Sequence, residues 1–169
     1  SFPNVAGTYL NAPTSTSLAA VADTVSYVAW VKWTNTATEQ AVMARGTSGL
    51  EMRLGTGGQV KALRGGSTTL AFSNVSITAG QWHMLAITKD GTTLGTKIYI
   101  DGGDVTSGLL ADTLTNGGGS VRLGDLPYAT GVLKYSGLMD EVAVWNVALT
   151  AAHVSTLYQE GLETIGTPG

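Results

Sequence analysis

Apolar residues alternate with polar ones along most of this chain of 169 residues, and the alternation restarts after each short glycine-rich break. A period of two is the spacing of side chains on one face of a β-strand, because successive side chains point to opposite faces. The breaks contain Gly, Asp, Asn and Ser, which tolerate the positive φ of tight hairpin turns. The pattern therefore predicts strands that recur about every ten residues, as in a sandwich or a barrel.

The strands are predicted at 25–33, 41–45, 50–54, 60–64, 69–72, 82–89, 97–100, 120–123 and 137–145. A short helix is predicted at 151–160, because Val154, Leu157 and Tyr158 fall on one helical face. Thr150 is its expected N-cap and Gly161 its expected stop. We expect a single domain over residues 1–162 and a tail or linker over 163–169.

The composition excludes several classes of protein. Hydrophobic residues make up 43% of the chain, which is enough for a sizeable core and argues against intrinsic disorder. The net charge is −3 with only 9 Lys and Arg, so we expect no nucleic-acid partner. No apolar run reaches the ~20 residues of a membrane helix, so no membrane insertion is expected. Cysteine is absent, which excludes disulfides, thiolate zinc sites and cysteine nucleophiles. Because Ser1 follows no leader segment, we expect a processed or excised chain.

Five segments, in three groups along the chain, resemble strand motifs of laminin-G-like domains. Segment 27–32 reads YVAWVK, segments 81–91 and 97–102 read QWHMLAITKDG and KIYIDG, and segments 121–124 and 135–150 read VRLG and YSGLMDEVAVWNVALT. Together they are similar, in the right order, to the concanavalin A-like lectin/glucanase superfamily. The resemblance implies an all-β, concanavalin A-like jelly-roll sandwich of two antiparallel sheets with one short C-terminal helix.

The glucanases of that superfamily carry paired carboxylates on alternate positions of one strand, so an enzyme of this kind should show the same pattern. Retaining hydrolysis needs two carboxyl groups ~5 Å apart, and a strand supplies them from positions i and i+2. The adjacent carboxylates here are Asp140 and Glu141, which strict alternation places on opposite faces. His83 and His153 lack a neighbouring Ser–Asp context. We therefore predict that the domain is not an enzyme.

Calcium is the candidate cofactor, because laminin-G-like domains often bind it through carboxylate and carbonyl oxygens. The metal ligands that the sequence offers are Asp140 and Asp125, with Asp23 as a further carboxylate. The alternative is that Asp140 accepts hydrogen bonds from backbone amides of its loop while Glu141 stays in solvent. The loops lack the dense Asp and Asn clusters of a strong calcium site.

Binding of surface carbohydrate is the function that the resemblance favours. Sugar sites combine an aromatic platform with a few hydrogen-bonding groups. The candidates are Trp30, Trp33, Tyr128 and Arg45, with Arg53 and Tyr135 also available. If the odd-numbered residues of 25–31 face the core, Trp30 lies on the outer face, where it binds a ligand or another chain, or is covered by loops. Trp82 and Trp145 are expected in the core.

The low charge content keeps a second function open. Only 12% of the residues are charged, about half the usual share, which suits a surface buried against copies of itself or a larger assembly. The alternative is thus a decoration, knob or fibre domain of a virus particle or cell-surface structure. The expected partners are a glycan or cell-surface polysaccharide, with a homo-oligomer as a further possibility. The expected location is extracellular, either secreted or on a cell surface, or on a virion.

Overall fold

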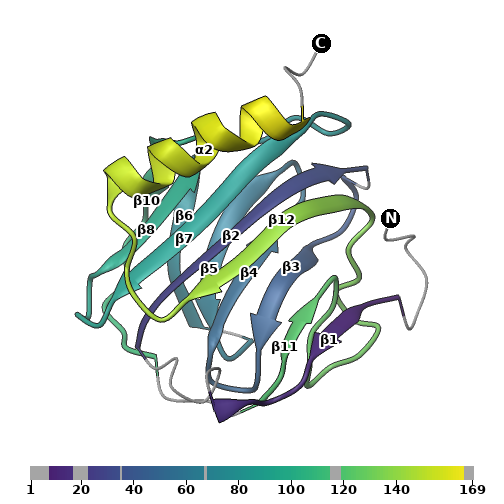
Figure 1. Cartoon of the computed structure of the whole chain (residues 1–169). Coiled ribbons are helices and arrows are strands. Elements are labelled where there is room, and N and C mark those ends of the chain that lie inside the picture. Colours follow the sequence, from purple (N-terminus) through teal and green to yellow (C-terminus); the bar gives the residue numbers. More distant parts are fainter. Residues whose placement is uncertain (1–7, 17–22, 35, 67, 115–118, 166–169) are drawn as a thin grey trace.

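The computed structural model of the protein describes residues 8–16, 23–34, 36–66, 68–114 and 119–165. Within them the chain forms two antiparallel sheets and one C-terminal helix, α2 (Ala151–Ile165). Figure 1 shows α2 lying across the outer face of one sheet, which we call the helix-side sheet. In spatial order its strands are β12 (Gly137–Trp145), β2 (Thr24–Trp33), β7 (His83–Asp90), β8 (Thr96–Ile100) and β9 (Gly103–Asp104).

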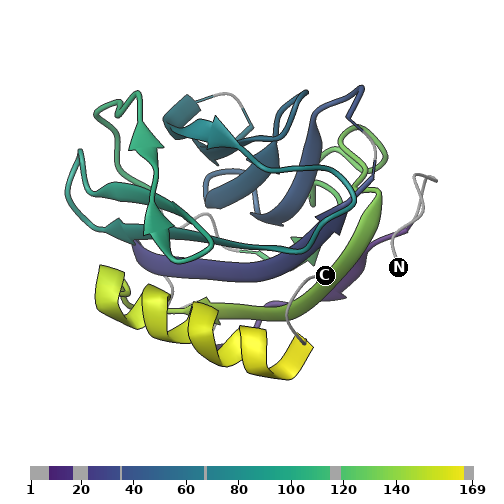
Figure 2. The same cartoon turned by 90° about the horizontal axis from the view of Figure 1, so that it is seen from above.

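The second sheet, which we call the loop-side sheet, packs on the other face of the helix-side sheet. In spatial order its strands are β1 (Leu10–Ala12), β11 (Val121–Leu123), β3 (Gln40–Arg45), β4 (Leu50–Leu54), β5 (Gln59–Arg64), β6 (Thr68–Ser76) and β10 (Thr106–Ser107). The view from above shows the resulting order of helix, helix-side sheet and loop-side sheet (Figure 2). The predicted sandwich is confirmed, and each predicted strand is present. The short strands β1, β9 and β10 were not predicted.

The two faces of β2 explain why this strand is almost wholly buried. Val25, Tyr27 and its other odd-numbered residues belong to the main core between the sheets. Val28 and Trp30 point the other way, into a second apolar cluster beneath α2. The exceptions are Thr24 at the start of the strand, which is exposed, and Lys32, which is partly exposed. A strand covered on both faces must be apolar on both, and β2 meets that requirement.

Helix α2 begins where the sequence predicted and ends later. The Thr150 hydroxyl accepts a hydrogen bond from the backbone N–H of His153 at 3.2 Å, so Thr150 is the N-cap. Gly161 does not stop the helix, which continues to Ile165. A Cβ at Gly161 would lie 2.4 Å from Trp30 Nε1. This glycine therefore permits close approach of the helix to the indole, a role that local propensity alone does not reveal.

A β-bulge in β12 breaks the alternation on which one prediction relied. Asp140 pairs with Trp30 and Ala143 with Val28, so two residues of β12 lie opposite Ala29. Glu141, the first of them, has a φ of 46°. Asp140 lies on the same face as its partner Trp30, and Glu141 lines a groove on that face too. The expectation that these carboxylates point to opposite faces is therefore wrong.

Candidate binding site

A cluster of charged side chains lies on the outer face of the loop-side sheet. Because Leu50, Met52 and Leu54 of β4 point into the core, Glu51 and Arg53 point outward. Lys61 of β5 is the cross-strand partner of Arg53. Glu39 immediately precedes β3, and Tyr128 comes from the loop 124–136 that follows β11. We call Glu39, Glu51, Arg53, Lys61 and Tyr128 the Tyr128 cluster.

Arg53 is the centre of the Tyr128 cluster. Its Nη1 lies 2.9 Å from Glu39 Oε1, and its Nε donates to Glu51 Oε2 at 2.8 Å. Its Nη2 donates to the Tyr128 hydroxyl at 3.2 Å and to the Gly66 carbonyl at 3.1 Å. The Tyr128 hydroxyl in turn donates to Glu51 Oε1. Lys61 Nζ donates to Glu39 Oε2 at 2.8 Å, so all five side chains form one network.

The loop 124–136 is held on the sheet by apolar and polar contacts. Leu126 is buried against Ala41 and Ala44 of β3, with Leu133 packed beside them. The buried Asp125 carboxylate accepts hydrogen bonds from the backbone N–H of Leu126 at 2.8 Å and of Gly131 at 2.6 Å. The loop therefore presents Tyr128 from a fixed position.

Burial within the Tyr128 cluster increases from its rim to its centre. The side chains of Glu39 and Lys61 are 26% and 29% exposed, whereas Glu51 is fully buried. Tyr128 is 37% exposed, so part of its ring is open to solvent. Burial, together with the hydrogen bond and charge of Glu51, raises the pKa of Tyr128 to about 12.

The pKa of Glu39 moves in the opposite direction. Burial alone would raise it, but the hydrogen bonds and charges of Lys61 and Arg53 outweigh burial and hold it below the usual value of 4.5. Glu39 is therefore ionised at neutral pH, and the cluster contains two carboxylates and two cations. Its charges cancel, and it presents both hydrogen-bond donors and acceptors at its rim.

The structure separates the four side chains that the sequence predicted for sugar binding. Trp33 is 1% exposed and lies in the core between the sheets, and Arg45 is 2% exposed on β3. Trp30 points outward as predicted, but α2 covers it and Tyr158 stacks on it at 5.6 Å. None of these three side chains therefore offers an exposed face on which a sugar could stack. Tyr128 alone of the four reaches the surface.

Sequence reasoning missed Glu39, Glu51 and Lys61. The signal for two of the central residues was present in β4, which reads Leu-Glu-Met-Arg-Leu. Opposite charges at i and i+2, flanked by apolar residues, indicate an ion pair on the outer face of a strand. Glu39 carried no such signal, because it lies 14 residues from Arg53.

The two predicted metal ligands do not converge. Asp125 binds backbone amides on the outer side of the loop-side sheet, as described above. Asp140 lies on the outer face of the helix-side sheet, where its Oδ1 accepts the Glu141 backbone N–H at 2.9 Å. Within the described residues, no group of three acidic or histidine side chains is placed to hold a metal ion. Asp125 and Asp140 therefore do not fit one calcium ion.

The histidine of β7 has a structural environment. His83 Nδ1 lies 2.7 Å from Asp101 Oδ2, and His83 Nε2 accepts the backbone N–H of Thr78 at 3.1 Å. Asp101 also accepts the Met84 backbone N–H at 2.9 Å. Both ring nitrogens are thus engaged in holding the turn after β8 against β7, and neither meets a serine.

Residues 4–155 match a family model described as the concanavalin A-like lectin/glucanases superfamily. The chain belongs to this superfamily. The match spans most of the chain and confirms the resemblance that the strand motifs indicated. No curated protein matches the sequence.

Solved structures with the same fold include several binding domains. A heptameric pentraxin from Limulus polyphemus is 19% identical, with a TM-score of 0.66 over 94% of this chain and 80% of the pentraxin chain. Domain 4 of an extracellular arabinanase from Geobacillus stearothermophilus, in complex with arabinotriose, is 26% identical, with a TM-score of 0.65 over 82% and 68%. A carbohydrate-binding domain of a Ruminococcus gnavus sialidase, bound to α2,3-sialyllactose, is 15% identical, with a TM-score of 0.68 over 82% and 84%.

Among the described residues of this chain, no helix is long and apolar enough to cross a membrane.

Proposed function

We propose that the domain binds carbohydrate without cleaving it, at the Tyr128 cluster. The observation that carries the proposal is the half-exposed ring of Tyr128, fixed in place by Glu51 and Arg53 beside the partly exposed Glu39 and Lys61. A sugar ring has one apolar face, which stacks on an aromatic ring, and hydroxyl groups that need charged or polar partners.

The cluster supplies both kinds of contact from a rigid arrangement. The Glu39 carboxylate accepts hydrogen bonds from sugar hydroxyls, and the Lys61 ammonium donates to them. Because Arg53 and the buried Glu51 already hold these groups, little side-chain entropy is lost when a sugar binds. A hollow of about 260 Å³ is lined by Thr47, Ser48, Arg64, Gly65 and Thr68, and Gly65 adjoins Gly66, whose carbonyl accepts a hydrogen bond from Arg53.

The charge balance of the cluster favours neutral sugars. Lys61 and Arg53 are both engaged by carboxylates, so neither is left over for the carboxylate of a sialic acid. The ligands in two of the similar structures, arabinotriose and α2,3-sialyllactose, represent neutral and acidic sugars, respectively. We expect this chain to bind neutral sugars, as part of a glycan or polysaccharide outside the cell.

Calorimetric titration with arabinotriose and a screen of neutral glycans test the proposal. Tyr128→Ala is expected to weaken binding at least about tenfold, because stacking on the ring is lost, whereas Tyr128→Phe keeps most of it. Lys61→Ala should weaken binding, and Lys97→Ala, on the helix-side sheet, should not. Equal affinity of Tyr128→Ala and the parent would refute the site.

The alternative of a structural assembly domain gives a different result. In that case no glycan is retained, and the protein sediments as a stable multimer whose size Tyr128→Ala does not change. Release of reducing sugar from the bound glycan would overturn the non-catalytic part of the proposal. Calcium is tested by repeating the titration with EDTA, and we expect no change because Asp125 and Asp140 lie apart.

A further inference from the structure

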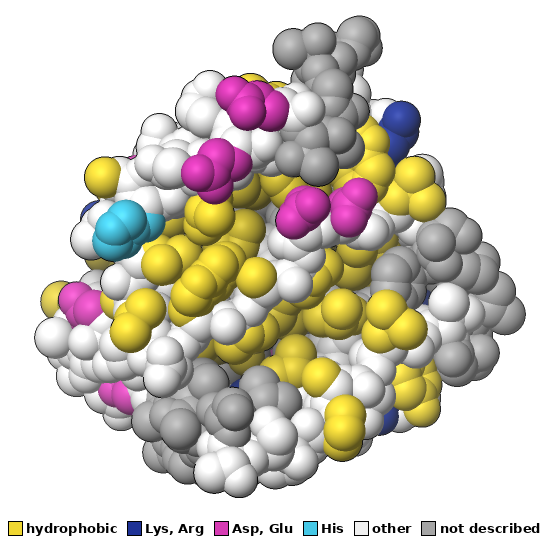
Figure 3. Space-filling view, in the orientation of Figure 1, with side chains coloured by type: hydrophobic (Ala, Val, Ile, Leu, Met, Phe, Trp, Pro, Cys, Tyr) yellow, Lys and Arg dark blue, Asp and Glu magenta, His cyan; other side chains and the backbone are white. Residues whose placement is uncertain are grey.

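A groove runs between α2 and β12 on the outer face of the helix-side sheet. Helix α2 packs over β2, β7 and β8 through Val154, Tyr158 and Leu162, and it leaves β12 at the sheet edge uncovered. The space left between helix and strand is a hollow of about 280 Å³. Figure 3 shows apolar side chains gathered over this face of the molecule, below the helix.

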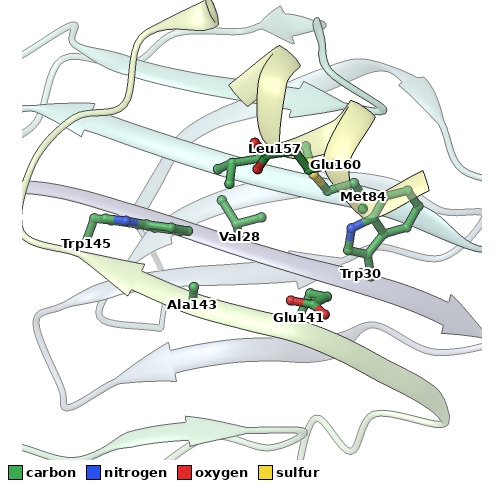
Figure 4. A pocket seen from close by; sticks show the side chains of 9 residues that line it. Val28, Trp30, Met84, Glu141, Ala143, Trp145, Leu157 and Glu160 are labelled. Atoms are coloured by element: carbon green, nitrogen blue, oxygen red, sulfur yellow. The ribbon is translucent and has the colours of Figure 1, made fainter. Parts of the chain in front are cut away.

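The groove has an aromatic and aliphatic lining. Val28 and Trp30 of β2 form its floor, Trp145 closes one end, and Leu157 contributes from the helix (Figure 4). Trp145 was predicted for the core, but it is only partly buried and forms the wall of the groove. A hollow of this size is at the lower end of ligand sites and suits a small molecule or one side chain.

Two carboxylates stand on opposite sides of this apolar lining. Glu141 comes from β12 and Glu160 from α2, and both line the groove (Figure 4). None of the groove-lining residues is Lys, Arg or His. The basic residues on the elements that line it are His153 of α2, which lines a neighbouring hollow with Trp145, Lys32 of β2, and His83 and Lys89 of β7. The groove is thus apolar inside and negative at its rim.

The β-bulge is what brings Glu141 to this rim. In regular alternation the residue after Asp140 would point into the core, where Val142 packs instead. Glu141 adopts a left-handed backbone that glycine takes more easily, and the Asp140 carboxylate accepts its N–H at 2.9 Å. Within the described residues, no Lys, Arg or His side chain forms an ion pair with Glu141.

We propose that this groove binds an organic cation, an ammonium or guanidinium group on an apolar stem, independently of the carbohydrate proposed for the other sheet. The stem fits against Val28, Ala143 and Leu157, and the charged head lies between Glu141 and Glu160. Trp145, at the end of the groove away from Glu141, contacts the apolar stem (Figure 4). An anionic ligand is repelled by both carboxylates, and a second copy of this chain would bring the same carboxylates toward each other.

The test uses n-hexylammonium as the probe, with n-hexanol and hexanoate as neutral and anionic controls of equal chain length. The readout is the indole N–H signal of Trp145 in a nitrogen–proton correlation spectrum, assigned with Trp145→Phe. We expect n-hexylammonium to shift this signal saturably and hexanoate to leave it unchanged. Hexanol should bind more weakly, and added salt should weaken only the cation.

Matched variants separate the charge effect from general changes. Glu141→Gln is expected to weaken binding of n-hexylammonium about threefold or more without changing that of hexanol, as one exposed charge contact would. Glu163→Gln makes the same change in net charge on α2 but does not line the groove, and it should bind like the parent. If Glu141→Gln does not fold, Glu160→Gln serves in its place.

Three outcomes would overturn the proposal. The first is equal binding of hexanol and n-hexylammonium, and the second is equal loss in Glu141→Gln and Glu163→Gln. The third is a shift of the Trp145 signal with protein concentration alone, which would show that a second copy occupies the groove. A second measurement distinguishes a lysine side chain of a protein partner from a free amine. It compares the tripeptide acetyl-Gly-Lys-Gly-amide with the same peptide carrying norleucine in place of lysine. Selective binding of the lysine peptide or of n-hexylammonium supports the site.

Discussion

The two outer faces of the sandwich are covered by different means. A helix covers most of the helix-side sheet, so Trp30 and Met84 are buried by apolar contact. The loop-side sheet is covered in part by the loop 124–136, and its central strand β4 presents Glu51 and Arg53 to Tyr128 of that loop. Apolar covering tolerates small changes of shape, whereas a buried network of charges holds only if every member keeps its partner.

The same difference separates the two proposed sites. The Tyr128 cluster is balanced in charge and rigid, which suits hydroxyl groups that need directed hydrogen bonds. The groove beside α2 is apolar with a negative rim, which suits a ligand bound by its stem and its charge. Each of the following changes is expected to act on one face and leave the other as it was.

Trp30→Ala has the largest expected effect. Removing a fully buried indole leaves a cavity beneath α2 and costs about 3–5 kcal/mol of stability. Urea unfolding followed by circular dichroism measures the loss. Trp145→Ala is the matched control, and it should cost clearly less because that ring is only partly buried. Equal losses in the two variants would show that α2 does not cover Trp30 in solution.

Arg53→Met is expected to cost about 3 kcal/mol, because it leaves the buried Glu51 without its cation. The double variant Glu51→Met/Arg53→Met should recover part of this loss, since no unpaired charge remains. Lys97→Met removes a surface ion pair with Asp104 and should cost less than about 1 kcal/mol. A double variant less stable than Arg53→Met would contradict a role for the unpaired charge.

The fold could be predicted from the sequence because its signals are local and repeated. Alternation and glycine turns locate each long strand, and Thr150 locates the start of α2. What failed depends on contacts between distant segments. Trp30 is covered by a helix 121 residues or more further along the chain, and Gly161 continues that helix because it meets the same indole.

The candidate site was predictable only in part for the same reason. Tyr128 was among the candidates for sugar binding, but its partners Glu51 and Arg53 lie more than 70 residues away. The alternation rule mispredicted the face of the sheet on which Glu141 lies, because one inserted residue in a bulge changes which face a side chain meets. Sequence patterns therefore identify elements better than they identify which faces meet.

Glu39→Gln has the smallest expected effect and concerns the pH dependence of the Tyr128 cluster. Because Lys61 and Arg53 hold the pKa of Glu39 below 4.5 in the folded protein, its contribution to stability is present above pH 4.5. That contribution is lost as the pH falls through the lowered folded value. The parent should therefore lose more stability than Glu39→Gln between pH 7 and pH 3, by less than about 1 kcal/mol because Glu39 is partly exposed.

The Asp90 carboxyl, whose pKa is lowered chiefly by hydrogen bonds from Thr92, contributes equally in both proteins and cancels. Thermal melts of both proteins across this range measure the difference, and parallel curves would show that Glu39 is not held by the network in solution.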